Sequence, residues 1–346
     1  MKEARSLPLE SWPIEYQRAL RRLSVPRRGR RSYSPATLAS TQVGMGQYLA
    51  TVQRAGLPLA LSPEGLTAFV TDLDARKLSN ASRLRYLANV QAIAKEIGYP
   101  VHYREILLED CAIYRSDMQL DMPRKVTALQ RKPLNLQDIR RASESARHAS
   151  QTASSASRRR SLLQRAVLLR LLSYVPLRIG DVSRLIIGST LLREPTGWRL
   201  SLLSGKTGFK YDTLLHQDLT GLLDALVFQE AGGTDIHMTC AQSHGRPLFH
   251  NQLGDPLSTQ TLRMSFKAAT GHTPHIVRTL VHDEMARLGS QGTALALDLC
   301  GQVSDGIERH YQVYAQRHRQ TDAQEALSRL QRAILVDPAL HIKLSG

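Results

Sequence analysis

The sequence is poor in cysteine and has no long apolar segment. Its three cysteines, Cys111, Cys240 and Cys300, are odd in number and far apart. They do not provide the disulfide framework of a small secreted domain, and they fit a reducing compartment. No apolar run approaches the ~20 residues of a membrane-spanning helix, and no signal peptide opens the chain. We therefore expect a soluble, cytoplasmic protein that makes no membrane contact.

Acidic residues are also too few to balance the basic ones. The 346 residues include 46 lysines and arginines against 30 aspartates and glutamates, which gives a formal net charge of +16. Arginine outnumbers lysine, and its planar guanidinium binds phosphate oxygens in pairs. This balance predicts a polyanionic partner, which we expect to be double-stranded DNA. The alternative is a basic surface that binds nothing.

Internal repeats and long low-complexity tracts are absent, and the length allows two domains, each with its own core. Residues 1–33 are interpreted as an irregular, basic N-terminal arm. Its candidate DNA-binding residues are Arg27, Arg28, Arg30 and Arg31, since each neutralised phosphate adds salt-dependent affinity. A solvated tail without a ligand is the alternative.

Residues 34–118 are expected to form a helical DNA-binding domain. Ser34-Pro35 and Ser62-Pro63 each combine an N-cap serine with a proline at the first helical position, and apolar residues follow at helical spacing. The third expected helix is basic on its polar side. Arg83 and Arg85 on that helix are further candidate DNA contacts.

The remainder is expected to be a linker and a second, larger domain. Residues 119–133 lack strong periodicity and are basic, so we interpret them as a linker in which Lys125 contacts DNA. Residues 134–346 are mainly helical by pattern, with a β-hairpin in Trp198–His216 that turns around Gly205–Gly208. The expected fold class is therefore mainly α with a small β-hairpin or sheet in the C-terminal domain (α+β).

The second half contains a set of residues suited to phosphodiester chemistry. Two arginines can clamp the negative charge that develops on a phosphate under attack, and a turn lysine can protonate the leaving oxygen. A tyrosine becomes a nucleophile when a base or a cationic site favours the phenolate. In chain order these residues are Arg178 in PLRIGD, Lys206 in GKTGFK, His275 and Arg278 in HIVR, Gln302 in LCGQ, and Tyr311, nine residues further on.

These sequence motifs, in this order and at this spacing, resemble those of the tyrosine site-specific recombinases, the phage integrase family. The resemblance covers Ser34–Tyr314 and includes Leu248-Phe249, which is similar to a P-L-F segment of the family. It implies a helical core-binding domain and a catalytic domain that close on duplex DNA. It also implies that Tyr311 attacks the scissile phosphate, giving a 3′-phosphotyrosyl bond and a free 5′-hydroxyl. Neither a metal nor another cofactor is required.

The resemblance also implies partners and a biological setting. The expected assembly is a homotetramer on two DNA sites, with accessory DNA-bending or directionality proteins as further partners. Residues 322–335 read as an amphipathic helix that docks either on a neighbouring protomer or on its own domain. We expect a nucleoid-associated bacterial enzyme that serves a mobile genetic element, such as a phage, a transposon or an integrative element.

Gln302 departs from the family pattern, which usually has His or Trp at this position. An amide can donate a hydrogen bond to phosphate, but it carries no charge and cannot shuttle a proton. His282 and His310 are candidates to compensate. Two other functions stay open: a catalytically impaired DNA-binding protein, and a type IB topoisomerase-like enzyme.

Three further assignments stay open at this stage. Lys210 is the second candidate for the general acid, because hairpin register is uncertain by a few residues, and Tyr314 is the second candidate for the nucleophile. A zinc site, disfavoured by its unusual spacing, is the alternative for a histidine-rich segment. Its potential ligands are His237, Cys240, His244 and His250.

Overall fold

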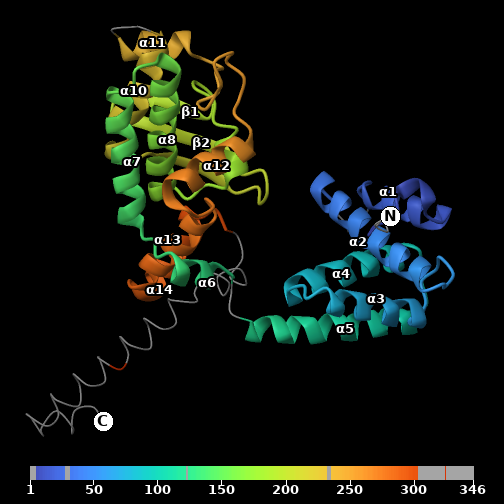
Figure 1. The fold of residues 1–346 in the computed structure, drawn as a ribbon. Helices are drawn as coiled ribbons and strands as arrows, with labels where there is room; N and C mark the ends of the chain where they lie inside the picture. Colours follow the sequence, from blue (N-terminus) through green and yellow to red (C-terminus); the bar gives the residue numbers. More distant parts are fainter. Residues whose placement is uncertain (1–4, 28–31, 122–123, 232–234, 303–323, 325–346) are drawn as a thin grey trace, which may run out of the picture. The chain divides into compact units, whose positions relative to one another are not determined.

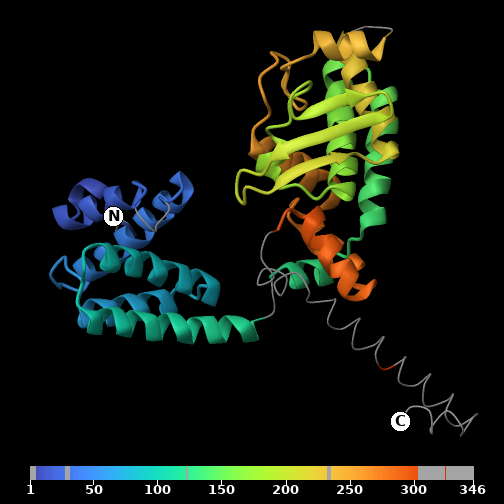
Figure 2. The same ribbon diagram turned by 180° about the vertical axis from the view of Figure 1, so that it is seen from behind.

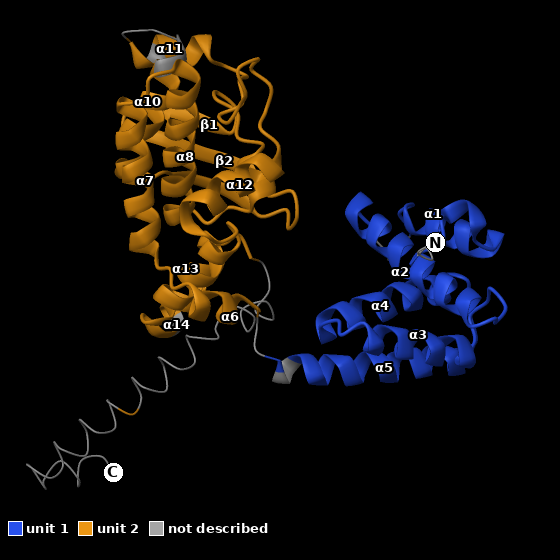
Figure 3. Ribbon diagram, in the orientation of Figure 1, with its two compact units in different colours: residues 1–123 blue, residues 124–346 orange. Residues whose placement is uncertain are grey.

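The chain forms two compact units, residues 1–123 and residues 124–346 (Figure 3). In the described part of the chain, no helix has both the length and the apolarity to cross a membrane. The computed structural model describes residues 5–27, 32–121, 124–231, 235–302 and 324.

The regular elements in the described part of unit 1 are all helices (Figure 1). The Ser34 hydroxyl accepts the Thr37 backbone N–H at 3.2 Å, and the Ser62 hydroxyl accepts that of Gly65 at 3.0 Å. These bonds satisfy N–H groups that helix starts otherwise leave open, so both expected N-caps are confirmed. The elements are η1 (Leu9–Ser11), α1 (Ile14–Leu23), α2 (Pro35–Arg54), α3 (Pro63–Ala75), α4 (Asn80–Glu96) and α5 (Val101–Leu120).

The N-terminal segment differs from the expected irregular arm. Helix α1 packs into the core of unit 1 through Tyr16, Leu20 and Leu23, which are all buried. The Tyr16 hydroxyl accepts the backbone N–H of Leu61 at 2.9 Å. These three residues are spaced i, i+4, i+7, so they share one helical face, and the arginines around them obscured this pattern.

The segment 119–133 also differs from the expected linker. Most of it is helix α6 (Arg124–Arg131), which belongs to unit 2. Val126 and Leu129 are buried, and Leu129 lines a small cavity with Leu280. Two apolar residues in one turn anchor this helix, and so short a stripe is hard to recognise between basic residues.

Unit 2 combines helices with one small sheet. The Asn135 side chain accepts the backbone N–H of Asp138 at 2.9 Å, and the Asp138 carboxylate accepts that of Asn135 at 3.0 Å, a reciprocal cap. The elements after α6 are α7 (Leu136–Gln151), α8 (Ala156–Tyr174), α9 (Ile179–Val182), β1 (Leu191–Glu194), β2 (Gly197–Leu203), β3 (Lys210–Leu214), η2 (Gln217–Leu219), α10 (Thr220–Ala231), α11 (Ile236–Gln242), α12 (Thr259–Thr270), α13 (Ile276–Ala286) and α14 (Gly289–Leu299).

The sheet is antiparallel with strand order β1-β2-β3, and Figure 2 shows it lying across helices α7, α8 and α10. Leu200 pairs with Leu191 on one side and with Thr213 on the other. Trp198, Leu200 and Leu202 alternate along β2 and are buried, as the two-residue period of a strand requires. The expected hairpin and the fold class, mainly α with a small sheet, are confirmed.

Candidate active site

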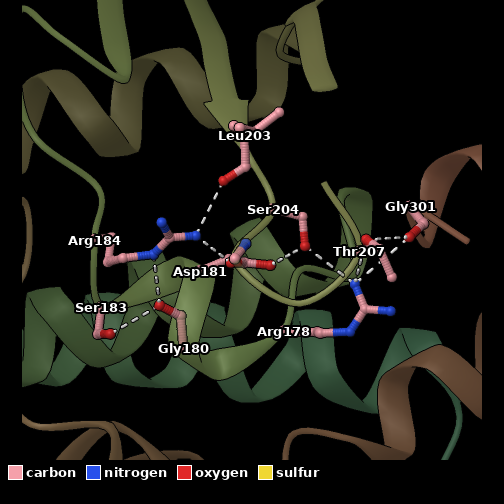
Figure 4. Close-up of polar contacts among 10 residues, drawn as sticks. Arg178, Gly180, Asp181, Ser183, Arg184, Leu203, Ser204, Thr207 and Gly301 are labelled. Carbon is pink, nitrogen blue, oxygen red and sulfur yellow. Dashed lines mark hydrogen bonds and ion pairs between the residues drawn. The ribbon is translucent and has the colours of Figure 1, made fainter. Parts of the chain in front are cut away.

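Arg178 stands at the N-cap of α9, directly after the chain leaves α8. Its Nη1 donates to the Ser204 hydroxyl at 3.2 Å, to the Thr207 hydroxyl at 3.4 Å and to the Gly301 carbonyl at 3.5 Å (Figure 4). The guanidinium therefore joins three segments that are far apart in the sequence: α9, the β2–β3 turn and the turn after α14.

Asp181, three residues after Arg178, also binds the β2–β3 turn. It is 3% exposed and accepts hydrogen bonds from the Ser204 hydroxyl at 2.8 Å and the Gly205 backbone N–H at 3.0 Å. Its ion-pair partner is Arg184 (Figure 4). A buried carboxylate with several charge-assisted hydrogen bonds is a strong anchor.

Lys206 is therefore presented by a turn that is fixed on both sides. Gly205 is bound to Asp181, and the Thr207 hydroxyl donates to the Gly301 carbonyl at 3.1 Å. Lys206 itself is exposed at the tip. Lys210 lies at the start of β3, where its Nζ is 3.8 Å from a carboxylate oxygen of Asp212.

His275 and Arg278 lie one helical turn apart at the start of α13. Arg278 is 1% exposed and donates from Nη1 to the Pro176 carbonyl at 2.9 Å. Within the described residues, its Nε and Nη2 have no hydrogen-bond partner. Both residues line a cavity of about 340 Å³ together with Arg178 and with Arg263 of α12.

The cavity is strongly cationic, and this affects His275. Protein atoms surround the imidazole although the residue is accessible from the cavity, and this desolvation lowers its pKa to about 4. The charges of Lys125, Arg278, Lys206 and Arg178 lower the pKa further in the same direction. His275 is consequently neutral at pH 7, with a ring nitrogen that can accept a proton.

Lys125 belongs to this cluster and not to a linker. Burial lowers its pKa to about 8, and the charge of Arg278 adds to the effect. The sequence predicted Lys125 as a DNA contact in a linker and not as a neighbour of His275, because its approach to α13 depends on how α6 packs. Arg263 was missed altogether, since an exposed arginine on an amphipathic helix carries no distinguishing signal.

Gln302 follows α14 and is 5% exposed. Its Oε1 lies 2.7 Å from Nε2 of His282 on α13. Its Nε2 has no hydrogen-bond partner among the described residues. Its neighbour Gly301, with φ +56°, accepts the bonds from Arg178 and Thr207, so the turn that carries Gln302 is attached to the hairpin.

The candidate DNA contacts of unit 1 are partly engaged within that unit. Nη1 of Arg27 lies 3.0 Å from the Glu96 carboxylate, and Nη1 of Arg83 lies 3.0 Å from that of Asp74. The Arg85 guanidinium lies over the ring of Tyr86, 5.5 Å from its centroid. The remaining predicted residues lie outside the described part of the chain. They are Arg28, Arg30, Arg31, His310, Tyr311, Tyr314 and the segment 322–335 apart from residue 324.

The histidine-rich segment is part of the folded unit. His250 is buried, and its Nδ1 lies 2.8 Å from the Asn251 carbonyl. Across the part of the chain that the structure describes, no group of three or more His, Cys, Asp or Glu side chains is placed to hold a metal ion.

Comparison with known proteins finds likeness in structure alone. No protein-family model matches the sequence, and no curated protein matches it. The post-cleavage complex of XerH site-specific recombinase bound to palindromic difH substrate is similar with a TM-score of 0.55 and 12% sequence identity, and the match covers 83% of this chain and 79% of that chain. The pre-cleavage complex of XerH with difH substrate has a TM-score of 0.50 and 14% identity, with 82% of this chain and 78% of that chain covered. XerA recombinase has a TM-score of 0.40 and 16% identity, with 89% of this chain and 98% of that chain covered. The expected resemblance to tyrosine site-specific recombinases is confirmed in the fold.

Proposed function

We propose that the chain is a tyrosine recombinase, which cuts and rejoins duplex DNA at specific sites through a 3′-phosphotyrosyl intermediate. The observation that carries this proposal is the cavity shared by Arg178, His275 and Arg278, because Nε and Nη2 of the buried Arg278 have no hydrogen-bond partner within the described chain. Buried, unpartnered N–H groups are costly unless a ligand satisfies them. A phosphate is an anion with the required acceptor oxygens, and the fold supports the same function.

In this mechanism the two arginines hold the non-bridging oxygens as negative charge develops on them. Neutral His275 accepts the phenolic proton, and the Tyr311 oxygen forms a bond to phosphorus. The bond from phosphorus to the 5′-oxygen breaks, and Lys206 gives that oxygen a proton. Rejoining reverses these steps with a 5′-hydroxyl from a partner strand, and the phosphotyrosyl bond conserves the energy of the broken diester.

Several wider features belong to the same proposal. Lys125 acts at the scissile phosphate, and Arg85 of unit 1 contacts the DNA backbone. The assembly is a homotetramer on two DNA sites, aided by accessory DNA-bending or directionality proteins, and it serves a mobile genetic element. The net charge of +16 supports the DNA partner.

The direct test is a search for covalent protein–DNA adducts. Cells that carry the protein and its native flanking DNA are lysed in denaturant, and the isolated DNA is probed for attached protein. Wild type is compared with Tyr311→Phe and Tyr314→Phe. Adducts that disappear only with Tyr311→Phe support the proposal, and disappearance only with Tyr314→Phe moves the nucleophile by three residues.

Two other results would contradict the proposal. Intact DNA binding without an adduct in the wild type would indicate a catalytically impaired DNA-binding protein. Relaxation of any supercoiled plasmid by a monomer would indicate a type IB topoisomerase-like enzyme.

A further inference from the structure

The Gln302 side chain is held at one end and open at the other. Its Oε1 is bound to His282, whereas its Nε2 is buried without a hydrogen-bond partner in the described residues. The two side chains are 5% and 2% exposed, so bulk water does not solvate this amide. A buried amide nitrogen in this state is a donor available to a ligand.

The chemistry of the amide settles which partner donates. An amide oxygen only accepts, so Nε2 of His282 carries the hydrogen in this bond. Burial lowers the pKa of His282, which keeps the ring neutral with one N–H to donate. If that donor were absent, the amide could rotate by half a turn and exchange the positions of its oxygen and its nitrogen.

The position of His282 on α13 explains how one helix serves two donors. His282 lies four residues after Arg278, so both side chains lie on the same face of the helix. Arg278 reaches the cavity directly, and its Nη2 has no partner in the described chain. His282 instead meets Gln302, which follows the neighbouring helix α14.

We propose that His282 is a positioning residue, which fixes the Gln302 amide so that its N–H group donates to the scissile phosphate. The inference rests on the proposed recombinase function and deepens it. Gln302 supplies a neutral donor where the similar recombinases usually have His or Trp, and His282 makes that donor dependable. Reversal of the amide would place an oxygen against phosphate oxygens, which replaces attraction by repulsion.

The first test observes the amide without any catalysis. Side-chain amides of the full-length protein are labelled with ¹⁵N at glutamine, and the Gln302 signal is assigned by its loss in Gln302→Glu. Inorganic phosphate is then titrated as the probe. We expect phosphate to shift this signal in wild type and in His250→Phe, a control that removes another buried histidine of unit 2.

In His282→Phe, we expect the Gln302 signal to move in the free protein and to lose its response to phosphate. An unchanged response in His282→Phe would overturn the inference, and so would a wild-type amide that does not respond to phosphate.

The second test measures adduct formation in a double-mutant cycle. We expect His282→Phe to slow single-turnover cleavage of the flanking DNA by about 10-fold, as loss of one oriented donor should. In a Gln302→Ala background the same change should cost less than about twofold, because the residue through which it acts is gone. His282→Gln, which can still donate to Oε1, should recover part of the rate.

A role of His282 in stability alone predicts a different cycle. Its effect would then persist in the Gln302→Ala background and would track the loss of melting temperature, and this result would overturn the inference. The two proposals fail separately. Absence of an adduct in wild type defeats the recombinase function, whereas an amide response independent of His282 defeats only the positioning role.

Discussion

The two sides of the candidate site differ in how far their polar groups are satisfied by hydrogen bonds within the protein. On the hairpin side, Asp181 and Ser204 belong to a continuous network, and Arg178 donates three hydrogen bonds to protein atoms. On the α13 side, Arg278 and Gln302 are equally buried, yet Nε and Nη2 of the first and Nε2 of the second have no partner among the described residues.

The contrast separates positioning from binding. A network whose members satisfy one another fixes the geometry of the residues that it holds. Unsatisfied buried donors instead cost about 1–3 kcal/mol each until a ligand accepts from them. The hairpin side therefore holds Arg178 and the general acid in place, and the α13 side keeps unsatisfied donors for the phosphate at a cost in stability.

The largest effect on the rate of adduct formation is expected for a substitution on the α13 side. Arg278→Met should lower the rate of adduct formation by about 10³-fold, because a donor to the developing charge is lost. The same change should raise the free energy of unfolding by about 1 kcal/mol, because removal of two unsatisfied buried N–H groups outweighs loss of the bond to the Pro176 carbonyl. Urea denaturation and single-turnover cleavage measure the two effects. Arg178→Met is the matched variant, and it should lower both quantities; a similar loss of stability in Arg278→Met would refute the contrast.

The next effect concerns the general acid on the hairpin side. Lys206→Ala should slow cleavage by about 10²-fold or more, because the leaving 5′-oxygen is no longer protonated. A substrate with sulfur at that bridging position should restore the rate, since a thiolate leaves without a proton. Lys210→Ala, on the same hairpin, should remain within about twofold of wild type. The opposite pattern would assign the acid to Lys210.

A smaller effect tests the anchor of the hairpin. Asp181→Asn should lower the free energy of unfolding by about 2–3 kcal/mol, because an amide group replaces an acceptor oxygen that two donors share. Cleavage should fall as well, and the sulfur-substituted substrate should recover much of it, since the defect lies in placing Lys206. Asp212→Asn, at an exposed position of β3, is the control and should cost less than about 1 kcal/mol. Equal losses in both variants would remove Asp181 from this role.

The smallest expected effect is the dependence of stability on pH. The pKa of His275 is about 4 in the fold against an ordinary value of 6.5, so between these values the unfolded chain binds a proton that the folded chain does not. Its contribution is therefore complete above pH 6.5 and is lost as the pH falls towards 4. The lowered pKa of His282 acts in the same direction. The free energy of unfolding, measured by denaturation at a series of pH values in this range, should change less with pH in His275→Gln than in wild type. An unchanged pH dependence would mean that His275 is not desolvated.

The sequence was sufficient for those parts that depend on local spacing. Capping residues such as Ser34 and Ser62 and the turn around Gly205–Gly208 predicted where helices and strands begin. The boxes around Arg178 and Arg278 identified side chains that line one cavity. Each of these signals lies within a few consecutive residues.

The parts that sequence reasoning missed depend on packing between distant segments. Helix α1 was not predicted, because the arginines between Tyr16, Leu20 and Leu23 made the segment read as a basic arm although these three residues form one apolar helical face. Lys125 comes under the charge of Arg278 because α6 lies close to α13, where Leu129 and Leu280 line one cavity, and nothing in its local sequence predicts that proximity. The bond between His282 and Gln302 joins α13 to the turn after α14, so spacing along the chain could name both residues but not their partnership.

Gly301 has a consequence for anyone who wishes to redesign this protein. Its backbone has φ +56°, which strains residues other than glycine, and a Cβ there would collide with the Tyr211 hydroxyl, so a side chain at this position is disfavoured for two independent reasons. The adjacent Gln302 faces no comparable backbone restriction. A library that randomises position 302 and leaves 301 untouched would therefore sample catalytic diversity on an intact scaffold, whereas one that varies both would consist largely of misfolded clones.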